Sequence, residues 1–198
     1  MLKVEDLLCI RNERVIFKQV AFALQPGAAL QIIGPNGIGK TTLLRMLAGI
    51  MRPAAGKIII NSKNISYVGH KHNLHPALTV SQNLKFLCAM AATTANLTTP
   101  CITKALEYFN MQSMATTPSG DLSAGQQQRI SLAALYLTNA KLWLLDEPLA
   151  HLDKDSVSLV TGLCIKHLNS GGSLVCATHE PLNLEPLHHA TLELQDYV

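Results

Sequence analysis

The sequence predicts one α/β fold built around a glycine-rich loop. Strand-like and helix-like segments alternate along the 198 residues, as a sheet covered by helices requires. An almost wholly apolar run over 28–33 leads into the glycine-rich segment Gly34-Pro-Asn-Gly-Ile-Gly-Lys40-Thr41, and a helical pattern begins at Lys40. Because a single core stops growing only at about 250–300 residues, we expect one domain that spans residues 1–198.

The first part of the chain is rich in strand patterns. Two β-rich segments open it, and a turn at Pro26-Gly27 ends the second one. The apolar run that follows is typical of a strand buried on both faces. After the glycines, leucines recur at helical spacing until Gly49. We therefore expect strands over 2–10, 15–24, 28–33, 57–60 and 65–69 and a helix over 40–50.

The character of the sequence changes at Thr79. Alanine, leucine, methionine and threonine recur there with helical periodicity, which predicts a helical insert over about 79–137. Farther on, Gly171-Gly172 ends a helical pattern. The expected elements are helices over 124–137 and 153–168 and strands over 142–145, 173–177 and 190–194. The methionines fit helix packing better than a cofactor site: Met46, Met51, Met90, Met111 and Met114.

Composition limits the classes of function. Charged residues make up only 15% of the chain and hydrophobic residues 48%, so the chain can bury a core. The formal net charge is +3 and no run of Lys or Arg exceeds two, which predicts no nucleic-acid partner. The uncharged stretch 86–103 carries threonines and Pro100, so we expect no membrane span. Five scattered cysteines and a charged N-terminus indicate a reduced, cytosolic protein.

The glycine-rich segment fits the phosphate-loop pattern GxxxxGK[ST] in its required context, after a strand and before a helix. Its backbone N–H groups would converge on phosphate oxygens, Lys40 would reach the β- and γ-phosphates, and Thr41 would bind Mg²⁺. A plain glycine turn before a helix is the alternative, but such a turn does not need the lysine. The candidate nucleotide ligands are Gly34, Pro35, Asn36, Gly37, Ile38, Gly39, Lys40, Thr41 and Thr42.

Two adjacent acids end the strand expected over 142–145. Asp146 would hold the magnesium ion, and Glu147 would orient and deprotonate the water that attacks the γ-phosphate. The alternative is that the two carboxylates cap the next helix.

Two further candidates are weaker when taken alone. The run Leu122-Ser-Ala-Gly-Gln126 precedes a helix, so Ser123, Ala124, Gly125 and Gln126 could present donors to an anion. An ordinary Ser N-cap explains the same pattern. His179 follows a strand, where a packed or solvated histidine is the alternative.

Together, these motifs resemble the ATP-binding subunits of ABC transporters over essentially the whole chain. The resemblance identifies residues 34–41 as Walker A, 122–126 as the signature, 142–147 as Walker B, 150–153 as the D-loop and His179 as the switch histidine. It implies a P-loop NTPase fold of ABC type with a RecA-like core, an N-terminal antiparallel β region and a helical insert that carries the signature. It also implies ATP and Mg²⁺ as ligands, and a dimer in which Ser123 and Gly125 face the nucleotide of the other subunit.

The sequence departs from the ABC pattern at two positions. The family stacks an aromatic residue on adenine, whereas the matching stretch here is Arg11-Asn-Glu13, so Arg11 is the candidate for stacking on the base. The family also has a Gln in the loop that senses magnesium and touches the membrane subunit, and here we expect His70 in its place.

The segment Tyr67-Val-Gly-His70 and the run Gln82-Asn-Leu-Lys-Phe86 resemble the CcmA family, the haem-exporter ATPases of cytochrome c maturation. This resemblance implies an ATP hydrolase coupled to haem export or to release of the haem chaperone. It also implies a CcmB-like membrane subunit and CcmC-like and CcmD-like haem-handling partners. The expected location is peripheral, at the cytoplasmic face of the bacterial inner membrane.

Other interpretations remain open from the sequence. A soluble ABC ATPase of an assembly scaffold, as in iron–sulfur assembly, has the same motifs, and so does the ATPase of another small-cargo transporter. A module that binds nucleotide without hydrolysis is disfavoured by Glu147 and His179. A haem or metal site at His70, His72 and His75 is disfavoured because no Cys or carboxylate lies nearby in the sequence.

Overall fold

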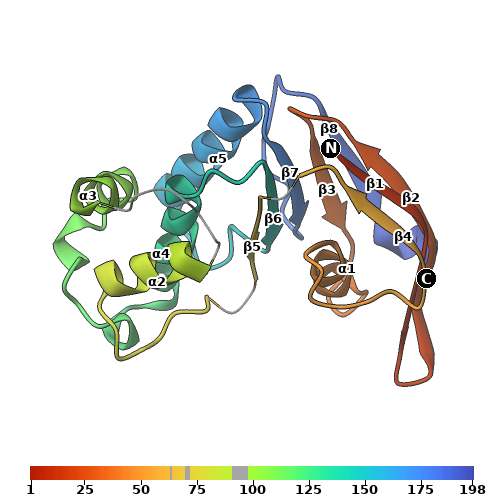
Figure 1. Cartoon of the computed structure of the whole chain (residues 1–198), viewed down its shortest axis with the longest axis horizontal. Helices are drawn as coiled ribbons and strands as arrows, with labels where there is room; N and C mark the ends of the chain where they lie inside the picture. Colours follow the sequence, from red (N-terminus) through yellow and green to blue (C-terminus); the bar gives the residue numbers. More distant parts are fainter. Residues whose placement is uncertain (63, 70–71, 91–97) are drawn as a thin grey trace.

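A computed structural model describes residues 1–62, 64–69, 72–90 and 98–198. Its elements form an antiparallel sheet, a parallel sheet and a group of helices that follow one another along the longest axis of the molecule (Figure 1). The antiparallel sheet has the order β2-β1-β4, and its strands are β1 (Leu2–Arg11), β2 (Arg14–Leu24) and β4 (Ala55–Ile60).

The parallel sheet lies in the middle and has the order β5-β6-β7-β3-β8. All four of its neighbouring pairs run parallel. The carboxyl ends of its strands therefore share one edge, where ligands bind in open α/β sheets. Its strands are β3 (Ala29–Ile33), β5 (Ile65–Val68), β6 (Leu142–Asp146), β7 (Ser173–Ala177) and β8 (His189–Glu193).

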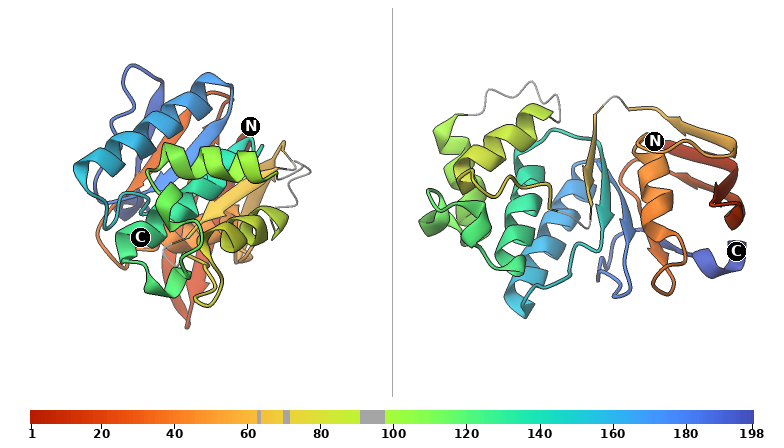
Figure 2. Two further views of the ribbon diagram at one scale, coloured as in Figure 1. Left: turned by 90° about the vertical axis from the view of Figure 1, so that its left-hand side faces the viewer. Right: turned by 90° about the horizontal axis from the view of Figure 1, so that it is seen from below.

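Helices cover both faces of the parallel sheet. The first, α1, packs between the two sheets, while α2, α3 and α4 gather at the end of the molecule away from the antiparallel sheet, as Figure 1 and the right view of Figure 2 show. The α-helices are α1 (Lys40–Leu47), α2 (Val80–Met90), α3 (Thr99–Tyr108), α4 (Ala124–Leu137) and α5 (Lys154–Asn169), and short 3₁₀ helices span Gln112–Met114, Ser119–Asp121 and Leu194–Tyr197.

The parallel sheet separates two hydrophobic clusters. Strand β6 is buried along its whole length, and its side chains alternate between them. Leu142 and Leu144 pack with α1 and the antiparallel sheet, whereas Trp143 and Leu145 pack with the helical side. Phe109 is fully buried on the helical side.

Several element ends differ from the sequence prediction for identifiable reasons. The helix expected over 40–50 ends at Leu47, because Gly49 takes the left-handed conformation (φ 73°) that closes helices. The helix expected from 153 begins at Lys154, because Asp153 is its N-cap. Strand β2 is irregular before Val20, where Gln19 (φ 56°) lies at a shift of the strand register. From Val20 onward the burial alternates, with Val20, Phe22 and Leu24 turned inward.

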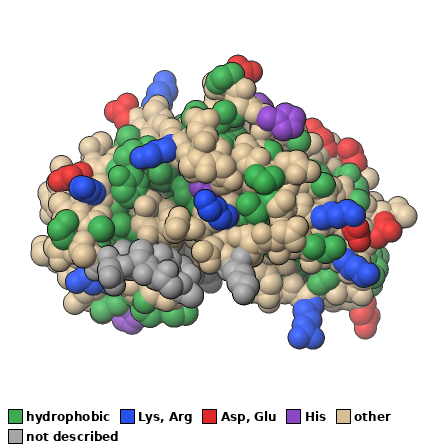
Figure 3. Space-filling view, turned by 45° about the horizontal axis from the view of Figure 1, so that its top comes forward, with side chains coloured by type: hydrophobic (Ala, Val, Ile, Leu, Met, Phe, Trp, Pro, Cys, Tyr) green, Lys and Arg blue, Asp and Glu red, His purple; other side chains and the backbone are tan. Residues whose placement is uncertain are grey.

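The surface is poor in charge, as the composition predicts. Figure 3 shows Lys and Arg side chains interspersed with Asp and Glu side chains on one face, with apolar side chains between them. Four of the five cysteines are buried thiols, and Cys101 is exposed. In the described part of the chain, no helix combines the length and the apolar character that a membrane crossing needs.

Candidate functional site

The glycine-rich loop connects β3 to α1 at the carboxyl edge of the parallel sheet. Gly34, Gly37 and Gly39 have φ angles of 145°, 84° and 115°, a region that favours glycine. A Cβ atom on Gly39 would lie 2.7 Å from Ile16 Cγ2, so the loop packs directly on the antiparallel sheet. This geometry leaves the N-terminus of α1 open to an anion.

Lys40 holds its ammonium group inside this loop. The side chain is 6% exposed, and Nζ donates to the carbonyl oxygens of Gly34 at 2.7 Å and Pro35 at 3.3 Å. Nζ also lies 3.7 Å from Glu147 Oε1. A buried cation therefore lies within the loop, where its donors are taken up by two backbone carbonyls of the loop.

Thr41 and Asp146 come together across the sheet edge. Thr41 Oγ1 donates to Asp146 Oδ1 at 3.0 Å, and Asp146 is 1% exposed at the end of β6. A hydroxyl and a carboxylate are hard oxygen ligands of the kind that Mg²⁺ prefers, so the pair fits the ion that the fold implies. Thr42 is half-buried at the next position of α1.

Glu147 lies between Lys40 and His179. Its Oε2 atom is 2.8 Å from His179 Nδ1 and accepts the His179 backbone N–H at 3.3 Å. The glutamate side chain is 15% exposed and the histidine side chain 59% exposed. His179 is therefore neither packed in the core nor an isolated surface residue: it fixes one oxygen of this carboxylate.

The helix-capping alternative for the two acids is wrong. The N-cap of α5 is Asp153, whose Oδ1 accepts the Ser156 backbone N–H at 2.8 Å. Hydrogen bonding from Ser156 lowers the pKa of Asp153. Asp146 and Glu147 therefore do not cap α5.

The signature residues open α4. Ser123 is its N-cap: Ser123 Oγ accepts the Gln126 N–H at 3.3 Å, and Gln126 Oε1 accepts the Ser123 N–H at 2.9 Å. The N-cap interpretation is therefore confirmed as local geometry. Among the described residues, no hydrogen bond or ion pair joins 123–126 to the phosphate loop of the same chain. Ser123 and Ala124 are exposed, and Gly125 packs against the backbone of His151.

Arg11 ends β1 and pairs across the hairpin with Arg14. The turn between them has positive φ at Asn12 (49°) and Glu13 (62°). Arg11, Asn12, Arg14 and Ile16 line a hollow of about 480 Å³, and the contact of Ile16 with Gly39 sets this hollow beside the phosphate loop.

The predicted role of His70 cannot be compared with the structure, because His70 lies outside the described residues. Within the ranges that are described, no three His, Cys, Asp or Glu side chains gather as a metal site. His75 is held by Asn83, whose Oδ1 accepts the His75 backbone N–H at 2.8 Å.

Three polar residues of the site were missed in the sequence. Gln31 in β3 is 2% exposed and exchanges hydrogen bonds with the backbone of Leu182, after the switch histidine, at 3.0 and 2.8 Å. Asn83 in α2 donates to Ser119 Oγ at 2.8 Å, close to the signature. Gln128 in α4 donates to Pro148 O at 3.0 Å. Gln31 had one signal, since it is the only polar residue in an otherwise apolar strand.

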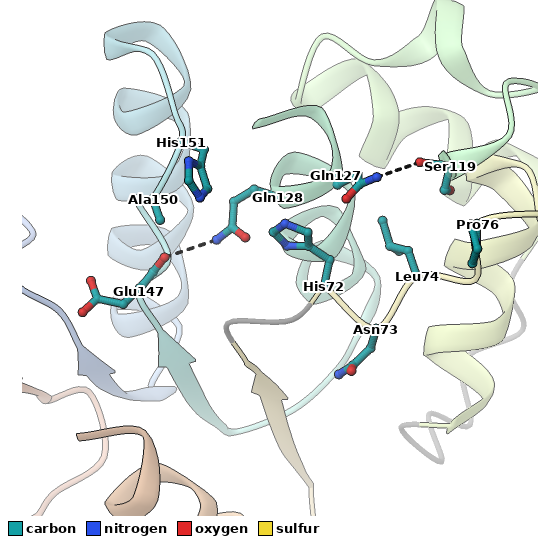
Figure 4. Close-up of a pocket in the computed structure, with 10 residues that line it drawn as sticks. All are labelled: His72, Asn73, Leu74, Pro76, Ser119, Gln127, Gln128, Glu147, Ala150 and His151. Atoms are coloured by element: carbon teal, nitrogen blue, oxygen red, sulfur yellow. Dashed lines mark hydrogen bonds between the residues drawn. The ribbon is translucent and has the colours of Figure 1, made fainter. Parts of the chain in front are cut away.

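A cleft of about 570 Å³ lies between Glu147 and His151 on one side and residues 72–76 on the other (Figure 4).

Cys176, in β7 next to β6, stays a neutral thiol, because burial above all raises its pKa well above the usual range. Cys164 and the carboxylates of Glu147 and Asp146 add to that rise.

The sequence matches the ABC transporter family over residues 17–150, which include the phosphate loop, the signature and Asp146-Glu147. The chain belongs to the ABC transporter family. It is an ABC ATPase subunit, and its fold is that of a nucleotide-binding protein.

Curated relatives of this ABC ATPase carry the name cytochrome c biogenesis ATP-binding export protein CcmA. The protein from Paracoccus denitrificans is 44% identical over 184 residues, covering 93% of this chain and 85% of the relative. The protein from Ruegeria pomeroyi is 42% identical over 184 residues, covering 93% and 87%. The protein from Escherichia coli O157:H7 is 38% identical over 195 residues, covering 93% and 91%.

Solved structures agree with the fold. An ABC transporter ATP-binding protein from Pyrococcus furiosus superposes with a TM-score of 0.83 at 25% identity, covering 99% of this chain and 98% of the other. A dimeric ATP-binding cassette in a post-hydrolysis state with ADP and phosphate has a TM-score of 0.84 at 22% identity, covering 98% and 95%.

Proposed function

We propose that this chain is the ATP-hydrolysing subunit of a membrane ABC complex that serves cytochrome c biogenesis. The observation that carries the hydrolytic part is the contact of Glu147 with both Lys40 and His179, at 3.7 and 2.8 Å. The names of relatives 38–44% identical to the chain support the cytochrome c part.

In the proposed mechanism, the phosphates of ATP lie on the N–H groups of loop 34–39. Lys40 exchanges the Gly34 and Pro35 carbonyls for the β- and γ-phosphates. Glu147 takes a proton from the attacking water, and His179 holds the glutamate oxygen in place. Thr41 and Asp146 would hold Mg²⁺, which neutralises charge on the phosphates when bound.

The signature residues support action in a dimer. Ser123 and Gly125 have no polar contact with the phosphate loop of their own chain among the described residues, and the helix that they open is exposed at its start. We infer that they complete the nucleotide site of a second copy, so that two chains enclose two ATP molecules. Arg11 would stack on the base in the hollow beside Gly39.

An apolar groove supports a membrane partner. It has a volume of about 520 Å³ and lies between the parallel sheet and the insert, with walls from β5, α2 and α4. Its rim includes Ile50, Phe86 and Met90, which are 64%, 49% and 72% exposed. Large apolar side chains gathered at one groove are typical of an interaction site. We infer that a CcmB-like subunit inserts an apolar segment there.

The remaining partners and the location follow from the same assignment. CcmC-like and CcmD-like haem-handling proteins would complete the complex, with this chain peripheral to the cytoplasmic face of the bacterial inner membrane. His70 would relay nucleotide state to the membrane subunit, an assignment that rests on the sequence alone.

Two measurements test this proposal. Glu147→Gln should keep ATP binding but lower steady turnover by about 10²-fold or more, since loss of a general base costs on that order. In that background, ATP with Mg²⁺ should shift the sedimenting species from monomer toward dimer, and Ser123→Arg should abolish the shift. Normal turnover in Glu147→Gln, or a shift unaffected by Ser123→Arg, would exclude the corresponding role.

The cytochrome c part needs a test in cells. Covalent haem in periplasmic c-type cytochromes should disappear when the chain is deleted, return with the wild-type chain and stay absent with Glu147→Gln. If c-type cytochromes are normal in the deletion strain, the cytochrome c role is excluded and the chain serves as the ATPase of another ABC transporter.

A further inference from the structure

The segment that carries Glu147 has an unfavourable backbone conformation at two positions. Glu147 and His151 have φ angles of 50° and 63°, in the left-handed region that non-glycine residues rarely adopt. Such conformations persist only where the surroundings hold them. Here the Glu147 N–H donates to Ala177 O at 2.8 Å, and the Glu147 carbonyl accepts the Ala150 N–H at 3.1 Å.

The side chain of Gln128, in α4, also stabilises this backbone conformation. It extends from α4 toward the backbone after β6, as Figure 4 shows. Nε2 donates to Pro148 O at 3.0 Å and lies 3.5 Å from Glu147 O. Gln128 is 2% exposed, and a buried amide is stable there because it is hydrogen-bonded.

Gly125 brings the helix close enough for this contact. It lies one turn before Gln128, on the same face of α4. A Cβ atom on Gly125 would lie 2.5 Å from His151 O, so the helix rests directly on the backbone of segment 147–151. The first turn of the signature helix and the segment that carries Glu147 therefore form one packed unit.

We propose that Gln128 is a positioning residue for hydrolysis, which holds the peptide after Glu147 and links the signature helix to the carboxylate of the same subunit. This rests on the proposed function, in which Glu147 acts on the ATP of its own chain while Ser123 contacts the ATP of the other. When α4 moves because Ser123 contacts the ATP of the other chain, Gln128 then shifts the backbone of Glu147 beside the ATP of its own chain.

The test measures ATP hydrolysis by the full chain. The protein concentration is high enough that the activity per chain no longer rises with concentration. Gln128→Met keeps the length of the side chain and removes the donor. Turnover should fall about tenfold, since small misplacement of a reacting group has effects of up to about 10²-fold. Nucleotide affinity should change by less than about twofold, because the phosphate loop is untouched.

Gln127→Met is the matched control. The neighbouring Gln127 donates Nε2 to Ser119 O at 2.9 Å, so this change also removes an amide-to-carbonyl bond from α4. It should leave turnover within about twofold of the wild type, because it does not touch segment 147–151. Equal losses in the two variants would overturn the proposal.

A double-mutant cycle separates positioning from general destabilisation. In the Glu147→Gln background, Gln128→Met should cause no further loss, because its effect passes through Glu147. A full additional loss, or wild-type turnover in Gln128→Met alone, would overturn the proposal. Normal turnover in Glu147→Gln alone would instead overturn the general-base assignment, and the role of Gln128 with it.

Gln128→Glu provides a second variant if Gln128→Met folds poorly. A protonated carboxyl group can donate to Pro148 O, whereas an ionised one cannot. Turnover relative to the wild type should therefore rise as the pH is lowered from about 8 to about 6, within the range to which burial can raise a glutamate pKa. A ratio that does not change with pH would overturn the positioning role.

Discussion

Replacement of Gly125 by alanine should separate activity from stability. The added Cβ atom would lie 2.5 Å from His151 O, and Cβ atoms in folded proteins essentially never approach below 3.0 Å. The helix and segment 147–151 must therefore move apart by about 0.5 Å or more, and overpacking of this kind costs about 1–3 kcal/mol of unfolding free energy. Alanine recovers about 1 kcal/mol through its helix propensity.

The net loss of stability should thus be about 0–2 kcal/mol, which leaves the chain folded at room temperature. The loss of turnover should be larger. The displacement moves both the signature residues and the backbone of Glu147, and shifts approaching 1 Å at a reacting centre cost up to about 10²-fold. We expect at least a tenfold decrease in steady-state ATP hydrolysis.

Gly162→Ala is the control for this prediction. Gly162 lies inside α5, where a Cβ atom would meet only Tyr108 Oη at 3.5 Å, an ordinary contact. In this variant the unfolding free energy, measured by urea titration, should rise by up to about 1 kcal/mol, and the turnover should stay at the wild-type value. If Gly125→Ala hydrolyses ATP at the wild-type rate, the tight contact between Gly125 and the backbone of His151 is refuted. A decrease that only follows the unfolded fraction would show that the contact serves stability alone.

Two further predictions concern the phosphate loop and the parallel sheet. Lys40→Ala should weaken ATP binding measured by isothermal titration calorimetry, because the ammonium contacts phosphates in the ground state; unchanged affinity would refute the phosphate-loop assignment. His167 stacks on Trp143, and burial lowers its pKa from 6.5, so the unfolded chain takes up a proton that the folded chain resists. The unfolding free energy should decrease as the pH falls below about 6.5, and the slope should be shallower in His167→Gln; equal slopes would contradict this.

The sequence predicts the fold and the position of the phosphate loop well, because both are encoded in contiguous segments. Residues 34–41 follow a strand and open a helix as predicted, and Asp146 ends β6 beside Thr41. Element ends were less accurate because they depend on caps. Gly49 closes α1 three residues before the expected end, and its φ of 73° cannot be inferred from hydrophobic spacing.

The polar contacts that join elements could not be predicted in this way. Gln31 pairs with a residue 151 positions away, Asn83 with one 36 away and Gln128 with one 20 away. Hydrophobic periodicity gives the face on which such a residue lies but not its partner. Met90 shows the opposite error: its spacing fits helix packing, yet it is 72% exposed at the rim of the apolar groove.

The magnitudes at Glu147 suggest why its position should respond to contacts in α4. A left-handed non-glycine residue costs about 1–3 kcal/mol. Three hydrogen bonds stabilise the segment against this cost. The Ala150 N–H donates to Glu147 O, Gln128 Nε2 donates to Pro148 O, and the Glu147 N–H donates to Ala177 O. Each bond contributes about 0.5–1.5 kcal/mol. The two sums are similar, so the loss of one bond brings the strained conformation close to balance with a relaxed one. A general base held this way is sensitive to small shifts of α4, as the cooperation of two nucleotide sites would require.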